Sequence, residues 1–120
     1  QVKAVNQVLV AGSYAAVAEA VALGQRLDLP MPKVLEALRG GAAGSWALSH
    51  RSDGMLASRY PLGFRLALHH KDLGIARSAA ESVQLELPIT SLVQGLEADL
   101  IQQGYGDDDV SALHRLFGTV

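Results

Sequence analysis

The sequence predicts an all-α domain, a bundle of five to six helices built on a long first helix. Apolar residues recur at helical spacing almost throughout the chain. No segment shows the alternation of apolar and polar residues that is typical of a half-buried strand. The chain has 120 residues, of which 49% are hydrophobic and 18% are charged. That length and composition suit one compact domain with a single hydrophobic core, so we expect residues 1–120 to fold as one unit.

The first helix should run from Val2 to Leu27 and end before Pro30, because proline disfavours helical geometry in the residue before it. Small side chains on this helix would let other helices approach its backbone closely. We therefore expect it to be the central helix of the bundle. The small residues are Ala11, Gly12, Ala15, Ala16, Ala18, Ala20 and Ala22.

Two shorter helices should follow. The second is expected to begin near Pro32, which suits a first helical turn, and to stop at the two glycines that follow Arg39. Ser45 is a suitable N-cap for a short third helix with the sequence WALSHR. The next segment, SDGMLASRYPLG (52–63), is expected to form a turn, a short helical piece and a loop.

The C-terminal half should contain three more helical segments. A long helix is expected over Phe64–Leu85, and another from Pro88 to Gly104. The acidic segment GDDD lacks the ligand spacing of a calcium-binding loop. Its last residue, Asp109, should instead cap a final helix with the sequence VSALHRLF.

Charge and composition argue against several classes of partner. The net charge is −2 without a basic block, which disfavours nucleic acid. The absence of cysteine excludes disulfides and suits a reducing cytoplasm. Because Lys3, Glu19, Gln25 and Arg26 bracket the longest apolar run, we expect no membrane-spanning segment. The chain starts without methionine and directly in a helical pattern, so we expect it to be a piece of a longer protein.

Three polar residues open the first helix. Lys3, Asn6 and Gln7 are spaced by three and four residues, which places them on one helical face. An ammonium beside two amides can hold a carbonyl or hydroxyl oxygen, and a buried lysine can transfer a proton. Spacing alone leaves a simpler alternative open and favours it, namely that these residues form a solvated helix end.

Other polar residues have equally simple local interpretations. Lys71 and Asp72 interrupt an apolar stretch and would locally be a solvated charged pair. His69 and His70 are adjacent and point about 100° apart on a helix, so they cannot form a metal-binding pair; we expect surface or core histidines and no metal. The glycine-rich segment GGAAGSW (40–46) follows no strand and lacks a nucleotide-binding fingerprint, so it should be a helix–helix turn.

Taken in order, four segments resemble the C-terminal helical domain of the β-hydroxyacid dehydrogenase family. That family includes 3-hydroxyisobutyrate dehydrogenase, tartronate semialdehyde reductase and the glyoxylate–succinic semialdehyde reductases. The signature K-x-x-N-[NQ] matches residues 3–7, and the glycine-rich segment matches residues 40–46. The F…KDL segment matches residues 64–73, and G-x-x-D-x-S-A matches residues 106–112.

The resemblance implies a 6-phosphogluconate dehydrogenase-like helical domain that acts with an N-terminal Rossmann domain absent from these 120 residues. The whole enzyme would transfer a hydride between NAD or NADP and a small 3-hydroxy acid or semialdehyde. The resemblance makes Lys3 the catalytic general acid/base and gives Asn6 and Gln7 the role of binding substrate. It makes Lys71 a cofactor contact, with most of the dinucleotide bound by the Rossmann domain.

The resemblance also implies residues that line the cleft, and an assembly. Phe64 and Asp72 should lie beside the cleft, and Ser45 and Trp46 are further candidates for its lining, although a buried core position is the simpler expectation for Trp46. We expect a homo-oligomer, and an isolated chain that does no chemistry because the dinucleotide-binding turn is missing. The alternative is a non-catalytic all-α oligomerisation module.

Overall fold

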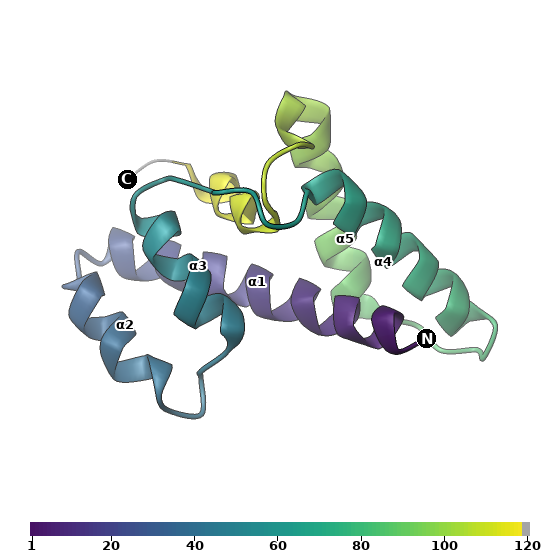
Figure 1. The fold of residues 1–120 in the computed structure, drawn as a ribbon, viewed down its shortest axis with the longest axis horizontal. Coiled ribbons are helices and arrows are strands. Elements are labelled where there is room, and N and C mark those ends of the chain that lie inside the picture. Colours follow the sequence, from purple (N-terminus) through teal and green to yellow (C-terminus); the bar gives the residue numbers. More distant parts are fainter. Residues whose placement is uncertain (119–120) are drawn as a thin grey trace.

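The structure is a computed structural model that describes residues 1–118 and consists of helices joined by short loops (Figure 1). Within those residues the only bridge between extended segments joins Arg65 and Asp109, so the all-α prediction is confirmed. The elements are α1 (Val2–Arg26), α2 (Met31–Arg39), α3 (Trp46–Leu56), α4 (Leu66–Glu81), α5 (Pro88–Leu100), a π-helical segment η1 (Ile101–Tyr105) and a 3₁₀ helix η2 (Val110–Phe117).

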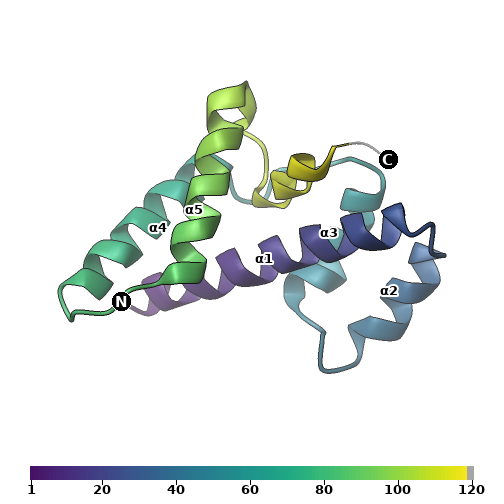
Figure 2. The same ribbon diagram turned by 180° about the vertical axis from the view of Figure 1, so that it is seen from behind.

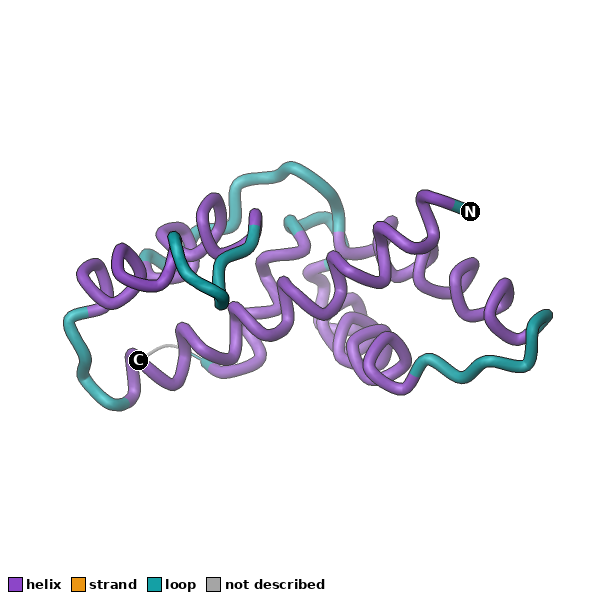
Figure 3. Tube along the Cα trace, turned by 90° about the horizontal axis from the view of Figure 1, so that it is seen from below, coloured by secondary structure: helices purple, strands orange, loops and turns teal. Residues whose placement is uncertain are grey.

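Helix α1 is the central element, as its small residues predicted. It contacts α2, α3, α4, α5 and η2. Helices α4 and α5 pack against its N-terminal half, whereas α2 and α3 flank its C-terminal half (Figures 1 and 2). Seen from below, α1 runs the length of the domain between these two groups (Figure 3). The two groups therefore share one spine, and the domain is elongated, with extents of 45 × 33 × 22 Å.

Close packing on α1 depends on its small residues. Ala11 and Ala18 are fully buried beneath the other helices. Gly24 is the tightest contact, because a Cβ added there would lie 2.3 Å from the sulfur of Met31 at the start of α2. A larger residue at Gly24 would thus require the flexible end of the Met31 side chain to move aside.

Helix α1 also bears on the expectation that no membrane-spanning segment is present. The polar residues that bracket the apolar run do not make α1 too short or too polar to span a membrane, so that reasoning was wrong. An 18-residue window of α1 has a mean hydropathy of 1.4, which is enough for a membrane span. Of that window, 44% is buried inside the domain. A core helix passes the same test, and the packing of α1 against five other elements is that of a core helix.

Helix α3 is longer than predicted. The sequence suggested a turn at Ser52–Gly54, yet the helix continues to Leu56. The Ser52 hydroxyl is buried and donates to the Leu48 carbonyl one turn earlier, so its hydrogen bond is made within the helix and not in a turn. The predicted cap at Ser45 is confirmed, since its Oγ accepts from the backbone N–H of Leu48 at 3.0 Å.

Helix α4 is shorter than predicted at both ends, beginning at Leu66 rather than Phe64 and ending at Glu81. The residues before it are extended because the Phe64 carbonyl accepts from the Val110 N–H at 2.9 Å. At the other end Gln84 has a positive φ of 54°, which turns the chain out of the helix.

The C-terminal segments follow the prediction with one change of geometry. The predicted helix from Pro88 keeps its α-form to Leu100 and then widens into the π-helical η1, which is kinked at Gly104, where φ is 99°, and ends at Tyr105. Asp109 caps η2 as predicted, accepting from the Ser111 N–H at 2.9 Å. η2 itself is a 3₁₀ helix.

Candidate functional site

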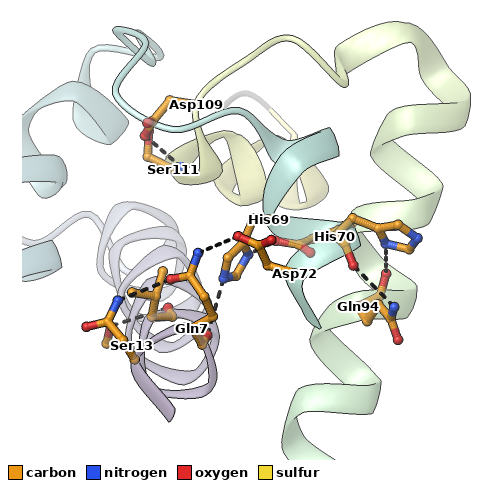
Figure 4. Close-up of polar contacts among 11 residues, drawn as sticks. Gln7, Ser13, His69, His70, Asp72, Gln94, Asp109 and Ser111 are labelled. Carbon is orange, nitrogen blue, oxygen red and sulfur yellow. Dashed lines mark hydrogen bonds and ion pairs between the residues drawn. The ribbon is translucent and has the colours of Figure 1, made fainter. Parts of the chain in front are cut away.

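The polar start of α1 faces α4, and its side chains meet there. The Lys3 ammonium lies 3.4 Å from Oδ2 of Asp72, and Nε2 of Gln7 donates to the same oxygen at 3.0 Å. Asn6 Nδ2 donates to Oε1 of Gln7 at 3.2 Å. The structure thus joins Lys3, Asn6 and Gln7 in one network of polar contacts with Asp72. Figure 4 shows the contact between Gln7 and Asp72.

The geometry follows from helix periodicity. Gln7 lies one turn after Lys3 and begins the buried face of α1, which continues through Ala11 and Tyr14. That face packs on α4 and brings Asp72 beside both residues. A depression of about 280 Å³ opens between the two helices. Its lining residues are Gln1, Lys3, Ala4, Gln7, Asp72 and Ile75.

Asp72 is held as a carboxylate. Its side chain is only 15% exposed, and burial opposes its charge. Hydrogen bonds from Gln7 and Lys3, together with the Lys3 charge, outweigh burial and lower the pKa of the carboxyl below its ordinary value. The local interpretation of Asp72 as half of a solvated pair with Lys71 is therefore wrong.

Lys3 itself is open to solvent within this domain, with 72% of its side chain exposed. Its ammonium therefore has room for a substrate oxygen as well as for Asp72. Burial of Lys3, which would help it to transfer a proton, would need a cleft completed by another domain, and that stays a prediction.

Phe64 and Lys71 lie at different depths beside this cluster. Phe64 is partly buried, and its ring meets the ring of His69 edge to face at 6.0 Å. Lys71 is exposed on α4, and within residues 1–118 its ammonium makes no ion pair or side-chain hydrogen bond. Phe64 does not line the depression, so its place beside a cleft stays a prediction, whereas Lys71 is available to a ligand.

Ser45 and Trp46 occupy the start of α3, and no polar contact links them to Lys3. The Ser45 hydroxyl is used by the helix cap. Trp46 is 55% exposed, so the expectation of a core position was wrong. Its ring stacks on His50 with centroids 4.3 Å apart, and the Arg51 guanidinium lies 4.7 Å from its centroid. Their part in a cleft stays a prediction.

Beneath the cluster lies a buried pair that the sequence analysis missed. His69 Nδ1 and Oε2 of Glu97 are 2.5 Å apart, and both side chains are fully buried. His69 is thus a core histidine, one of the two positions expected for it. His70 is half-buried, with Nδ1 3.2 Å from the Gln94 carbonyl. Across residues 1–118, no three His, Asp or Glu side chains gather to hold a metal ion.

A second buried carboxylate, Asp109, joins the segments that meet at the start of α4. Asp109 Oδ1 accepts from the backbone N–H groups of Gly63 and Phe64 at 3.0 and 2.9 Å. Its Oδ2 lies 3.2 Å from Nε of Arg51. Asp109 therefore does much more than cap η2, because it also sets the extended segment that precedes α4.

Comparison with known proteins identifies the family. The profile of a family described as "NAD-binding of NADP-dependent 3-hydroxyisobutyrate dehydrogenase" matches residues 1–117. The chain belongs to this family of β-hydroxyacid dehydrogenases. The resemblance seen in the four sequence segments is thereby confirmed.

Two curated relatives and one solved structure illustrate the similarity. An uncharacterized oxidoreductase YkwC of Bacillus subtilis is 36% identical over 96% of this chain and 40% of its own length. The 2-hydroxy-3-oxopropionate reductase of Escherichia coli is 35% identical over 92% of this chain and 38% of its own. A 3-hydroxyisobutyrate dehydrogenase from Salmonella typhimurium superposes with a TM-score of 0.87 at 28% identity, covering 96% of this chain and 40% of that one.

The matches also show what share of a relative's length this chain represents. It spans about two fifths of the length of the relatives that it matches. These relatives are oxidoreductases, so the domain described here is part of an oxidoreductase family that uses nicotinamide cofactors.

Proposed function

We propose that this chain is the C-terminal substrate domain of an NAD(P)-dependent hydroxyacid dehydrogenase or semialdehyde reductase, with Lys3 as general acid/base. One observation carries the proposal. The Lys3 ammonium, which matches the family's signature lysine, stands beside Asp72 and Gln7 at the mouth of an open depression. Relatives are named for 2-hydroxy-3-oxopropionate, L-serine and L-threonate. These names favour a small carboxylic acid with a hydroxyl or aldehyde group as substrate.

In the direction of reduction, Lys3 donates a proton to the carbonyl oxygen, and in the direction of oxidation it takes that proton back from the hydroxyl. The bound nicotinamide supplies or accepts the hydride. Asp72 orients the ammonium because it lies within ion-pair distance of Nζ.

The two amides have different roles in this proposal. Both polar ends of the buried Gln7 side chain are engaged, since its Nε2 donates to Asp72 and its Oε1 accepts from Asn6. Asn6 is exposed and keeps its Oδ1 and one N–H free. Asn6 therefore has polar atoms available to a substrate, whereas Gln7, which lines the depression, positions Asp72.

Residues 1–118 can contact only a small part of a dinucleotide cofactor. No strand with a glycine-rich phosphate turn is present in them, so most of the cofactor must be bound by a further domain, proposed here as an N-terminal Rossmann domain. The free, exposed ammonium of Lys71 suits a phosphate or ribose oxygen.

Changing Lys71 to alanine in the full-length enzyme should weaken cofactor binding. We expect KM for NAD(H) or NADP(H) to rise by about tenfold, since one charge-assisted contact contributes about 1.5–3 kcal/mol, with a much smaller change in kcat at saturating cofactor. Steady-state kinetics with varied cofactor measures this effect. An unchanged cofactor KM would show that Lys71 is a solvated surface charge and does not bind the cofactor.

A homo-oligomer is proposed from the exposed apolar surface of α1 and α5. A depression of about 210 Å³ there is lined by small residues of α1, including Ala16, and by Ile89 and Leu92, which are 67% and 64% exposed. We expect Ala16→Glu in the full-length enzyme to reduce the assembly to monomers, because a carboxylate would be buried without a partner. Light scattering measures the mass. A wild-type monomer, or a variant of unchanged mass, would contradict this use of the surface.

The function is tested by assaying the full-length protein with both nicotinamide cofactors. The substrates are L-serine, L-threonate, 3-hydroxyisobutyrate and 2-hydroxy-3-oxopropionate, and nicotinamide absorbance reports hydride transfer. We expect saturable turnover with at least one of them. Self-association without turnover on any small hydroxy acid or semialdehyde would favour the alternative, a non-catalytic oligomerisation module.

A further inference from the structure

The buried pair of His69 and Glu97 lies directly behind the candidate site. His69 projects from α4 and Glu97 from α5, and neither side chain is exposed at all. The second ring nitrogen of His69, Nε2, lies 3.3 Å from the backbone carbonyl oxygen of Gln7 (Figure 4). A carbonyl oxygen can only accept a hydrogen bond, so this contact requires a proton on Nε2.

The contacts fix how many protons the pair holds. With Nε2 protonated, one further proton is shared between Nδ1 of His69 and Oε2 of Glu97. Whichever of these two atoms carries that proton, the pair as a whole has no net charge. Burial raises the pKa of Glu97, which favours keeping that proton within the pair. The other carboxyl oxygen, Oε1, has no hydrogen-bond partner among the described residues. The titratable groups that face the pair are His70, Asp72 and, beyond Asp72, Lys3.

Gln7 is held from α4 at two points. His69 and Asp72 are three residues apart on α4 and therefore lie on one face. His69 contacts the backbone carbonyl of Gln7, and Asp72 accepts from the Gln7 side chain. Glu97 holds His69 from the other side. Three helices thus meet at the residue one turn after Lys3.

We propose that His69 and Glu97 are positioning residues: Glu97 orients the His69 ring through the shared proton, the Nε2–H of His69 holds the Gln7 carbonyl, and Lys3 and Asp72 are thereby kept in register across α1 and α4. This inference rests on the proposed function of Lys3. Neither residue touches substrate, because both are buried beneath the depression.

The test compares activity with stability in the full-length enzyme. In the double variant His69→Leu/Glu97→Leu, apolar side chains replace a neutral buried pair, an exchange that often leaves stability unchanged or raised. We expect the thermal midpoint to be retained and kcat to fall by about tenfold or more, with a smaller change in the cofactor KM. A retained midpoint with wild-type kcat would overturn the proposal.

Two further variants make the result specific. His114→Leu is the matched control, since His114 is a buried histidine that contacts Tyr60 and Gln25, away from Gln7; its kcat should stay at the wild-type value. In Glu97→Gln the amide can donate to Nδ1 and preserve the proton on Nε2, so kcat should stay within about threefold of wild type. A loss in Glu97→Gln as large as that in the double variant would overturn the shared-proton account.

A measurement on the wild-type enzyme decides the matter even if the double variant does not fold. Nitrogen-15 NMR of labelled histidines should show Nε2 of His69 protonated at every pH at which the enzyme is active. An unprotonated Nε2 would overturn the proposal. Lys3→Met is assayed in parallel. If that variant stays active, the proposed function fails, whereas an inactive Lys3→Met beside an active double variant removes only the role of the pair.

Discussion

Lys3→Met in the full-length enzyme is expected to lower kcat by about 10²–10⁴-fold, the contribution of a general acid/base. Methionine keeps much of the length of the side chain and removes the proton. The fold should survive, because the Lys3 side chain is 72% exposed and its ion pair with Asp72 lies at the surface. Steady-state kinetics and a thermal melt of the same preparation measure both properties.

The matched control is Lys33→Met, which removes an exposed ammonium from α2. We expect the control to keep the wild-type kcat. A Lys3→Met enzyme that kept more than about a tenth of wild-type turnover, well short of the range for a general acid, would show that another group moves the proton.

Asp109→Ala is expected to destabilise the domain by about 3–5 kcal/mol, the cost of breaking a buried ion pair. The carboxylate is almost completely buried and has several partners. Without it, the Arg51 guanidinium loses its partner charge, and three backbone N–H groups lose their acceptor. These are the N–H groups of Gly63, Phe64 and Ser111. Denaturant unfolding measures the change.

The control for Asp109 is Asp53→Ala, which removes a carboxylate that is 75% exposed and pairs with Arg39 at 2.9 Å. An exposed pair contributes about 0–1 kcal/mol, so this variant should unfold almost as wild type does. Equal losses in the two variants would contradict the structural role of Asp109.

The contribution of Asp109 should also depend on pH. Burial opposes its charge, but hydrogen bonds from Ser111 and from the backbone of Phe64 and Gly63 outweigh burial and lower its pKa below the ordinary value of 3.8. A carboxyl with a lowered pKa in the folded state stabilises above its unfolded pKa, and this stability is lost as the pH falls through the folded pKa. The difference in unfolding free energy between wild type and Asp109→Ala should therefore be full at neutral pH and shrink below about pH 4. A difference that does not change with pH would contradict the ionised role.

Local signals predicted the helix starts better than the helix ends. Ser45 and Asp109 were recognised as caps because a cap depends on a few adjacent residues. The end of α3 was misplaced because Ser52, a turn-forming residue by sequence, is buried and bonds back into the helix. The start of α4 was misplaced because Phe64 is held extended by Asp109 and Val110, which are distant in the sequence.

The candidate site was predictable to the same extent. Helical spacing put Lys3, Asn6 and Gln7 on one face, but it could not show that Asp72 lies opposite them, which came from the family resemblance. The His69–Glu97 pair joins two helices across 28 residues, and no spacing rule connects them. The signal that was available was a carboxylate within an apolar stripe, because Glu97 shares the buried face of α5 with Val93 and Leu100.

The most direct test is a structure of the full-length enzyme with its nicotinamide cofactor and a bound hydroxy acid. The account predicts that Nζ of Lys3 lies about 2.6–3.2 Å from the reacting substrate oxygen, within reach for proton transfer. It also predicts that Asp72 and Gln7 keep the contacts seen here. A substrate oxygen held by another acid or base, with Lys3 turned toward solvent, would contradict the assignment of Lys3 as the catalytic residue.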